Sequence, residues 1–372
     1  MADLRLGIVQ DYVPQFRVAF FEGLIDRLSG AGIECVVIAG EPTGSQAARS
    51  DAAQPLNSLR QASAHEVRIG PNGPRVYGFG SSRNWRDCDG VIHALRGTAI
   101  DLHMEILAKR FSGRRVGVWG HIGRKVNSPN ALDVMLERWQ MRHSDHVFGY
   151  TRECADAALA AGMPAGKITA VMNSIEVDTL LDAYRALDRE KVETFINRHS
   201  LTPGKIFGFI GGLDSSKRID FLAEVLEYLW RSDRDVKIIV GGKGDNQGLL
   251  EPARERGQVI MLGFSGPVEK AMIMKTSQAL VNPGRIGLVA VDALAVGIPI
   301  LATDWNFHAP EYDYLERGHD VLESRNVVSD FGKLVLQATA SGESIPLHEG
   351  RPYPSLDQMV ENFALGVQKM FA

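Results

Sequence analysis

The sequence predicts an α/β protein built from two doubly wound domains, each a parallel sheet covered by helices. The chain has 372 residues, which is longer than one ordinary domain. Short apolar runs alternate with amphipathic helical segments along most of it, a pattern typical of parallel sheets with helical connections. A second strand–loop–helix series begins after a change of unit that starts at Asn173. We therefore expect domains at 1–173 and 174–354, with a closing helix in 355–372 that packs back on the first domain.

The first series starts with a buried strand at Leu4–Val9. A helix follows, with apolar residues at helical spacing, namely Val18, Phe21, Leu24, Ile25 and Leu28. The segment Gly40–Ala64 is rich in Gly, Pro, Ser and Ala and predicts a loop. Further elements are expected as strands at Ile33–Ala39, Gly90–Ile92, Val116–Trp119 and Ile168–Met172, and as helices near Asp133 and over Cys154–Ala161.

The second series repeats this alternation, with its clearest helix at Ile219–Trp230. Its expected strands are Ile206–Ile210, Val236–Val240, Val259–Leu262, Ala279–Val281 and Pro299–Ala302. Ligands of such sheets bind outside the carboxyl ends of the strands. Two such domains in one chain predict an active-site cleft between them.

Composition narrows the class of protein. Hydrophobic residues make up 45% and charged residues 23%, and the net charge of -4 argues against a dedicated nucleic-acid binder. Three cysteines without a CxxC pair suit a reducing compartment. The N-terminus leads directly into a strand, and no apolar run approaches the ~20 residues that span a bilayer. We expect a soluble, cytoplasmic protein.

Charge is unevenly distributed, with roughly +3 on residues 1–175 and about -7 on the rest. A local basic cluster comprises Arg110, Arg114, Arg115, Arg124 and Lys125. It is either a solvated surface or a site that attracts a phosphorylated acceptor or the anionic inner face of a membrane.

The stretch from Asn282 to Pro299 is the most informative element. A turn with Gly284 and Gly287 opens into a helix from about Leu288, so the amides of 284–288, with Arg285 and Ile286 between the glycines, can approach an anion such as a diphosphate. Asp292 lies one turn into this helix, where a carboxylate can accept hydrogen bonds from ribose hydroxyls. The plain alternative is a tight βα turn followed by an exposed Asp.

This stretch resembles the nucleotide-binding signature of family 4 retaining glycosyltransferases (glycosyl transferases group 1), which have the GT-B fold of two Rossmann-like domains. Gly287-Leu288 and Ala293 to Pro299 match the signature. Asp292 occupies the place of the ribose-binding Glu. Gly284 occupies the place of the Glu that contacts the donor sugar, so no carboxylate is present there.

Ile210 to Asp220 forms a second motif, in which Gly211 and Gly212 follow a strand and Lys217 precedes a helix. A cation there can stabilise charge that develops on a leaving diphosphate, and the alternative is a surface lysine. In the family a Gly-Arg-Leu turn and a Lys hold the pyrophosphate. Lys217 matches in spacing, whereas Gly212 replaces the Arg, whose charge either Arg218 or Arg285 could supply.

Two weaker motifs follow in register. Gly242 lies in a turn that resembles the family's Gly-x-Gly, and Phe264 follows the strand whose loop lines the nucleobase in the family. Taken singly, both read as ordinary glycine turns after strands. His308 to Glu311 resembles the family's Gly-Pro-Glu and is expected to shape the donor loop, with Glu311 a further site candidate.

The first half offers His121, directly after a strand, which in the family faces the donor sugar; the alternative is a loop histidine bonded to backbone. The family's first Gly-Gly loop is replaced by Val13 to Arg17, where Arg17 is a candidate for acceptor or phosphate contact. Asn173 to Asp178 resembles the interdomain hinge. Asp87-Cys88-Asp89 has the form of a GT-A metal pair but lies in the wrong context, so we expect a surface loop, no metal and no cofactor besides the nucleotide-sugar.

The resemblance implies a retaining transferase (hexosyltransferase type), with His121 and Lys217 as catalytic residues, acting from the second, nucleotide-binding domain on an acceptor at the first. The donor is an NDP-sugar, UDP- in preference to GDP-, and the acceptor is a hydroxyl of a glycan or lipid-linked molecule in polysaccharide biosynthesis. Two alternatives stand: an inactive GT-B-like scaffold, which the losses at Gly212 and Gly284 would suit, and a nucleotide-sugar epimerase. The sugar, the linkage and the oligomeric state do not follow from the residues.

Overall fold

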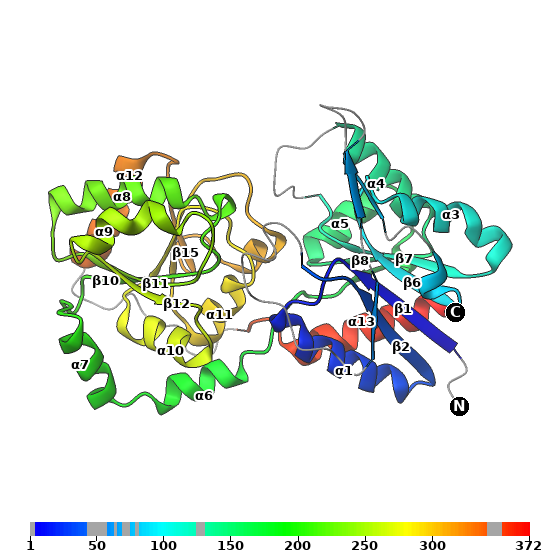
Figure 1. The fold of residues 1–372 in the computed structure, drawn as a ribbon, viewed down its shortest axis with the longest axis horizontal. Coiled ribbons are helices and arrows are strands. Elements are labelled where there is room, and N and C mark those ends of the chain that lie inside the picture. Colours follow the sequence, from blue (N-terminus) through cyan, green and yellow to red (C-terminus); the bar gives the residue numbers. More distant parts are fainter. Residues whose placement is uncertain are drawn as a thin grey trace. The chain divides into compact units, whose positions relative to one another are not determined.

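The computed structural model describes residues 4–42, 58–62, 65–68, 75–78, 82–123, 131–340 and 352–372. The chain divides into two compact units (Figure 1). Unit 1 comprises Met1–Glu176 with Pro354–Ala372, and unit 2 comprises Val177–Tyr353. The chain therefore leaves unit 1, forms unit 2 and returns, so that its last helix belongs to unit 1.

Unit 1 is built on a seven-stranded parallel sheet in the order β3-β2-β1-β6-β7-β8-β9. Its strands are β1 (Leu4–Gln10), β2 (Ile33–Ala39), β3 (Leu59–Gln61), β6 (Gly90–Ala94), β7 (Arg115–Gly120), β8 (His146–Gly149) and β9 (Ile168–Ala170). A separate antiparallel pair joins β4 (His65–Arg68) and β5 (Arg75–Gly78). The helices are α1 (Val18–Ser29), α3 (Ile100–Ser112), α4 (Ala131–His143), α5 (Arg152–Ala160) and α13 (Leu356–Phe371).

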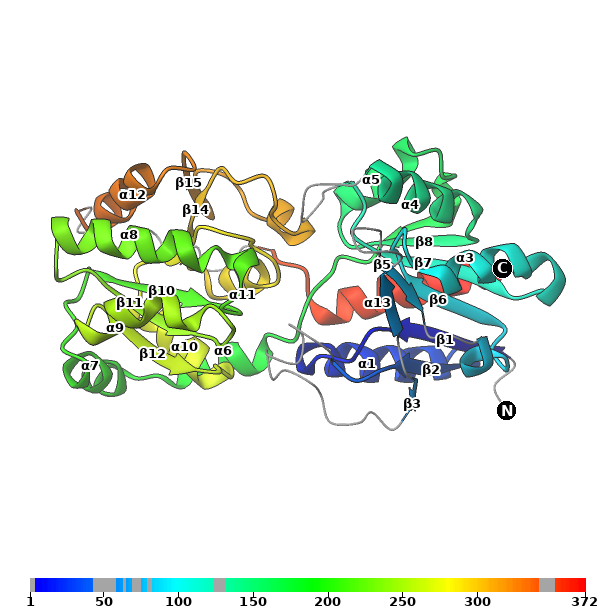
Figure 2. The same cartoon turned by 45° about the horizontal axis from the view of Figure 1, so that its top comes forward.

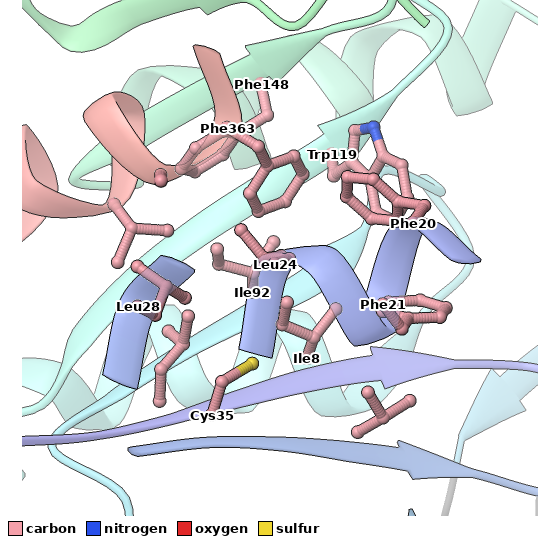
Figure 3. Close-up of a cluster of buried hydrophobic side chains, with 14 of the residues drawn as sticks. Ile8, Phe20, Phe21, Leu24, Leu28, Cys35, Ile92, Trp119, Phe148 and Phe363 are labelled. Atoms are coloured by element: carbon pink, nitrogen blue, oxygen red, sulfur yellow. The ribbon is translucent and has the colours of Figure 1, made fainter. Parts of the chain in front are cut away.

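Helices α1 and α13 lie side by side on one face of this sheet (Figure 2). Phe363 of α13 is fully buried against the sheet. Its ring stacks on that of Phe148 of β8, with the ring centroids 4.5 Å apart. Figure 3 shows it meeting Phe20 of α1 and Trp119 of β7 in the same aromatic cluster. The end of the chain thus contributes central core residues to unit 1.

Unit 2 is built on a six-stranded parallel sheet in the order β12-β11-β10-β13-β14-β15. Its strands are β10 (Ile206–Ile210), β11 (Lys237–Gly241), β12 (Val259–Gly263), β13 (Leu280–Asn282), β14 (Ile300–Thr303) and β15 (Val321–Ser324). Its helices are α6 (Asp178–Ala186), α7 (Arg189–Arg198), α8 (Ile219–Ser232), α9 (Glu251–Glu255), α10 (Pro267–Thr276), α11 (Val289–Val296) and α12 (Val328–Ala340).

Helices cover both faces of this sheet. Phe207 and Phe209 of β10 point to the face packed by α8 and α12, whereas Ile206 and Ile210 point to the face packed by α6, α10 and α11, as the period of two in a strand requires. The chain runs from β10 through α8 to β11 on one side and later places β13 on the other side of β10. This reversal makes the carboxyl ends of β10 and β13 the switch point where ligands of such sheets bind.

The expected fold class is confirmed, because both sheets are parallel and doubly wound. Several elements were not anticipated by residue range, namely strands β3, β4, β5, β8 and β15 and helices α3, α6, α7, α9, α10 and α12. Most of the loop expected at Gly40–Ala64 lies outside the described residues, but β3 within it pairs with β2 in parallel register. In the described part of the chain no helix is long and apolar enough to cross a membrane.

Candidate functional site

The site predicted in unit 2 lies on three loops that follow β10, β11 and β13. Backbone hydrogen bonds join the first two loops, from the Gly211 amide to the Gly241 carbonyl at 3.0 Å and from the Leu213 amide to the Lys243 carbonyl at 2.9 Å. The Arg285 amide of the third loop donates to the Ser216 carbonyl at 2.9 Å. Sequence segments some seventy residues apart are therefore bound into one rigid rim at the switch point.

Lys217 occupies the centre of this rim, at the end of a single 3-10 turn (Ser215–Lys217). Asp214 caps the turn by accepting the Ser216 amide at 2.9 Å. The Lys217 ammonium donates to the Arg285 carbonyl at 2.5 Å. The cation is consequently fixed beside the β13–α11 loop instead of extending into solvent.

Gly284 is a glycine because no side chain fits there. A Cβ at this position would lie 2.4 Å from the Lys217 carbonyl carbon and 2.7 Å from its Cα, where real Cβ atoms are essentially never found. Gly242 is equally constrained, since its Cβ would lie 1.9 Å from the Gly211 carbonyl oxygen. The carboxylate that the family resemblance implies at 284 is thus excluded by the close approach of two backbones.

Gly287 differs from these glycines. The atoms nearest to a Cβ there would be Ala309 Cβ at 3.6 Å and Glu311 Oε2 at 3.8 Å, which are ordinary contacts. It directly precedes Leu288, the N-cap of α11, where amides and the helix dipole favour an anion. Packing within the protein therefore does not demand glycine at this position.

Asp292 is buried in α11, with 3% of the residue exposed. Its carboxylate forms an ion pair with Lys270 of α10 at 2.7 Å. The plain alternative of an exposed Asp is therefore wrong. Lys270 was not identified from the sequence, because nothing in its spacing from Asp292 links α10 to α11.

The two arginines proposed to replace the missing charge differ in their surroundings. Arg218 has a left-handed φ of 54° and stacks on Phe221, with 4.1 Å from Cζ to the ring centroid. Its guanidinium donates to Asn326 Oδ1 at 2.5 Å and to the Pro283 carbonyl at 3.2 Å, and burial lowers its pKa. Arg218 thus supports the β13–α11 loop from within unit 2, while the half-buried Arg285 lies on that loop itself.

His308 fixes the other side of the same loop. Its Nδ1 accepts the Ile286 amide at 3.2 Å, and its ring stacks on Tyr312 at 4.1 Å with an interplanar angle of 6°. Because Nδ1 accepts, the ring proton lies on Nε2, which faces the Thr303 carbonyl at 3.4 Å. The segment from His308 to Glu311 does shape the loop, and it places the buried carboxylate of Glu311 beside Gly287.

Phe264 follows β12 at the same edge of the sheet and is 52% exposed. An exposed aromatic ring at this edge is available for stacking on a flat ligand. Its position agrees with a nucleobase contact, which stays a prediction.

In unit 1, His121 directly follows β7 and packs edge-on against Tyr150, with ring centroids 4.5 Å apart. Arg17 is 7% exposed and donates to Asn173 Oδ1 at 2.6 Å. Its cation also lies 5.3 Å from the Trp119 ring centroid. Arg17 therefore joins the start of α1 to the segment at Asn173 inside unit 1 and is nearly closed to solvent.

Two further expectations concern charged clusters of unit 1. Asp87 pairs with Arg60 and Arg5, and the hydrogen bond from Arg60 lowers the pKa of its carboxyl well below the usual range. It lies in a surface loop, as expected, and the described residues contain no group of side chains suited to a metal. In the basic cluster, Arg114 forms a buried ion pair with Glu105 at 2.7 Å and is not solvated, whereas Arg124 and Lys125 lie outside the described residues.

The decisive comparison concerns unit 2. Residues 204–338 match the family described as glycosyl transferases group 1. The matched stretch lies within unit 2. The match spans all three loops of the rim together with Lys217 and Asp292.

One curated relative and two solved structures are also similar to this chain. Poly(ribitol-phosphate) alpha-N-acetylglucosaminyltransferase of Staphylococcus aureus is 26% identical over 190 residues, which are 46% of this chain and only 37% of the relative. HepE of Anabaena, solved with UDP, has a TM-score of 0.62 at 12% identity and covers 99% of this chain and 97% of its own. UDP-GlcNAc 2-epimerase of Methanocaldococcus jannaschii gives 0.57 at 14% identity, over 98% and 99%. At these identities the two structural likenesses concern the fold alone.

The contrast between Gly284 and Gly287 predicts that the same substitution destabilises the protein at one position and not at the other. Gly284→Ala should lower the free energy of unfolding by about 1–3 kcal/mol, because the methyl group must displace the Lys217 backbone. Gly287→Ala should leave it within about 0.5 kcal/mol, since the methyl group meets only ordinary contacts. Urea unfolding of the two variants tests this, and equal losses would show that the two loops are not packed as described.

Proposed function

We propose that the protein is a retaining glycosyltransferase that moves a sugar from a nucleoside diphosphate sugar to a hydroxyl of an acceptor. The observation behind this is the rim of unit 2, where a fixed lysine and an accessible glycine turn at a helix N-terminus lie within a group 1 domain. Each feature favours a diphosphate by itself. Because the lysine and the glycine turn lie together at the switch point of the sheet, they favour a nucleotide that carries a diphosphate.

The Lys217 ammonium and the amides of the loop from Gly284 to Leu288 would bind the diphosphate. In this role they stabilise the negative charge that grows as the bond from the sugar to the diphosphate breaks. Asp292 would bind the ribose and Phe264 the base. His121 would face the sugar. The configuration of the sugar is retained if the diphosphate leaves and the acceptor hydroxyl enters on the same face. This route depends on positioning and needs no protein nucleophile.

UDP is the favoured nucleotide. The relative in Staphylococcus aureus is named as a transferase of N-acetylglucosamine to poly(ribitol phosphate), and HepE was solved with UDP. Both names support a UDP-sugar donor and a polyol or glycan acceptor for this chain. No metal is needed in this proposal, because a lysine and backbone amides supply the positive charge.

Glu311 is our candidate for the carboxylate that Gly284 cannot provide. It is 3% exposed, and its Oε2 lies 3.8 Å from where a Cβ of Gly287 would be. A carboxylate at that loop can accept hydrogen bonds from sugar hydroxyls. The donor contact would then come from the segment after β14 instead of the loop after β13.

An epimerase and an inactive scaffold are the competing functions, since the fold admits all three. The direct test is release of free UDP from UDP-N-acetylglucosamine and UDP-glucose, measured with and without a polyol phosphate or glycan acceptor. We expect release that depends on the acceptor. Interconversion of UDP-sugars without acceptor would indicate an epimerase. UDP binding by thermal shift without turnover under any acceptor would indicate a scaffold.

Lys217→Ala should lower turnover at least roughly tenfold, the effect of losing one group that stabilises developing charge. The variant also loses the hydrogen bond to the Arg285 carbonyl, so its unfolding must be measured beside its rate. Lys333→Ala is the control, because that lysine is 63% exposed on α12. Turnover of Lys217→Ala equal to that of the control would remove Lys217 from the mechanism.

The substitution Glu311→Gln tests whether Glu311 contacts the donor sugar and not the nucleotide. We expect the KM for the UDP-sugar to rise at least about fivefold, as for loss of a charged hydrogen bond, while the affinity for UDP itself stays unchanged. Glu255→Gln, at an exposed position of α9, is the control for kinetics and stability. A parallel loss of UDP affinity would mean that Glu311 supports the loop and does not contact the sugar.

A further inference from the structure

Helix α3 of unit 1 has apolar residues on both of its sides. Leu102 and Ile106 are buried against the sheet. On the outer side Ile100, Met104, Leu107 and Phe111 are exposed by 49%, 60%, 60% and 91%. Their spacing of four, three and four residues aligns them in one stripe along the helix. A surface helix normally presents polar residues on that side, so this stripe requires an explanation.

The neighbouring helix α4 extends the same character. Its Leu132 and Met135 are 49% and 58% exposed, and the ring of Trp139 lies 5.2 Å from that of His103 of α3. Figure 1 shows the two helices next to each other in unit 1. Large exposed apolar side chains are thus gathered on two adjacent helices, which marks an interaction surface.

The most exposed charges on these two helices are all positive. In α3 and α4, which are both described over their full length, the charged side chains in the exposed class are Arg110, Arg138 and Arg142. Arg115 is exposed at the start of β7, directly beyond α3. The acidic residues of the two helices are Asp101, Glu105, Asp133 and Glu137, and none is in that class. Glu105 is neutralised by Arg114 at 2.7 Å.

We propose that the outer side of α3, with the adjoining part of α4, docks unit 1 on an anionic lipid surface. Exposed aromatic and aliphatic side chains flanked by arginines are the composition of a helix that lies in a membrane interface. Anionic headgroups complement the arginines over distances within a Debye length, about 8 Å at physiological ionic strength. The surface would place the enzyme at a membrane, whichever sugar it transfers, so the inference does not depend on the proposed reaction.

Vesicle sedimentation tests the proposal with the full chain. Vesicles of phosphatidylcholine alone are compared with vesicles in which about a third of the lipid is phosphatidylglycerol. We expect binding to the anionic vesicles that weakens in high salt. The double variant Leu107→Ser and Phe111→Ser should lower the affinity at least about tenfold. Leu159→Ser, at a leucine of α5 in the same unit that is 50% exposed, should not change the affinity.

A fluorescent label on α3 tests whether the stripe itself enters the lipid surface. All three native cysteines are buried, and burial raises the pKa of Cys35 to about 12 and of Cys88 to about 11, so a new exposed cysteine reacts selectively. An environment-sensitive fluorophore on Phe111→Cys should shift to the blue with anionic vesicles, and the same fluorophore on Leu159→Cys should not.

Three results would overturn the proposal. The first is that the chain binds neither kind of vesicle. The second is that the double variant binds the anionic vesicles as well as the unaltered chain does. The third is that the unaltered chain binds no vesicles but forms dimers in solution, and that the double variant is monomeric. The stripe would then be the surface for a second copy of the chain.

Discussion

The candidate site depends on the close approach of two backbones, at Gly284 and Lys217. Because no Cβ separates them, the loop after β13 lies directly on the turn after β10, and the Lys217 ammonium reaches the Arg285 carbonyl at 2.5 Å. The loop is fixed on its other side by His308, which accepts the Ile286 amide. A loop held at both sides presents its amides in one geometry, and such preorganisation is what makes amides effective toward a developing charge.

Several charged side chains have their partners inside the units. Asp292 forms an ion pair with Lys270 and Arg114 forms one with Glu105, while the buried guanidinium of Arg17 donates a hydrogen bond to the neutral side chain of Asn173. A buried charge without such a partner would cost several kcal/mol, so these pairs are required whenever the residue itself is buried. In the proposed site, Lys270 would orient the Asp292 carboxylate toward the ribose.

The sequence predicted the sheets well because each strand of a parallel sheet is a short apolar run bounded by glycine or a helix. It also located the glycine loops, since their order along the chain follows the strands. It could not separate the glycines that packing requires, such as Gly284 and Gly242, from Gly287, where it does not. That distinction depends on which backbone lies opposite, and the opposite backbone belongs to a distant segment. Lys270 was missed for the same reason.

Helix α3 was missed for a different reason. From Ile100 to Ile106 its apolar and polar residues alternate strictly, which is the period of a strand and not that of a helix. In the helix this alternation distributes apolar residues to the inner side, at Leu102 and Ile106, and to the outer side, at Ile100 and Met104. A helix that only had to cover a sheet would have polar residues on the outer side and would show the helical period in its sequence. The alternation that does not show the helical period is therefore also what leaves an apolar stripe on the surface of unit 1. A partner surface for the outer side of α3 would account for this stripe.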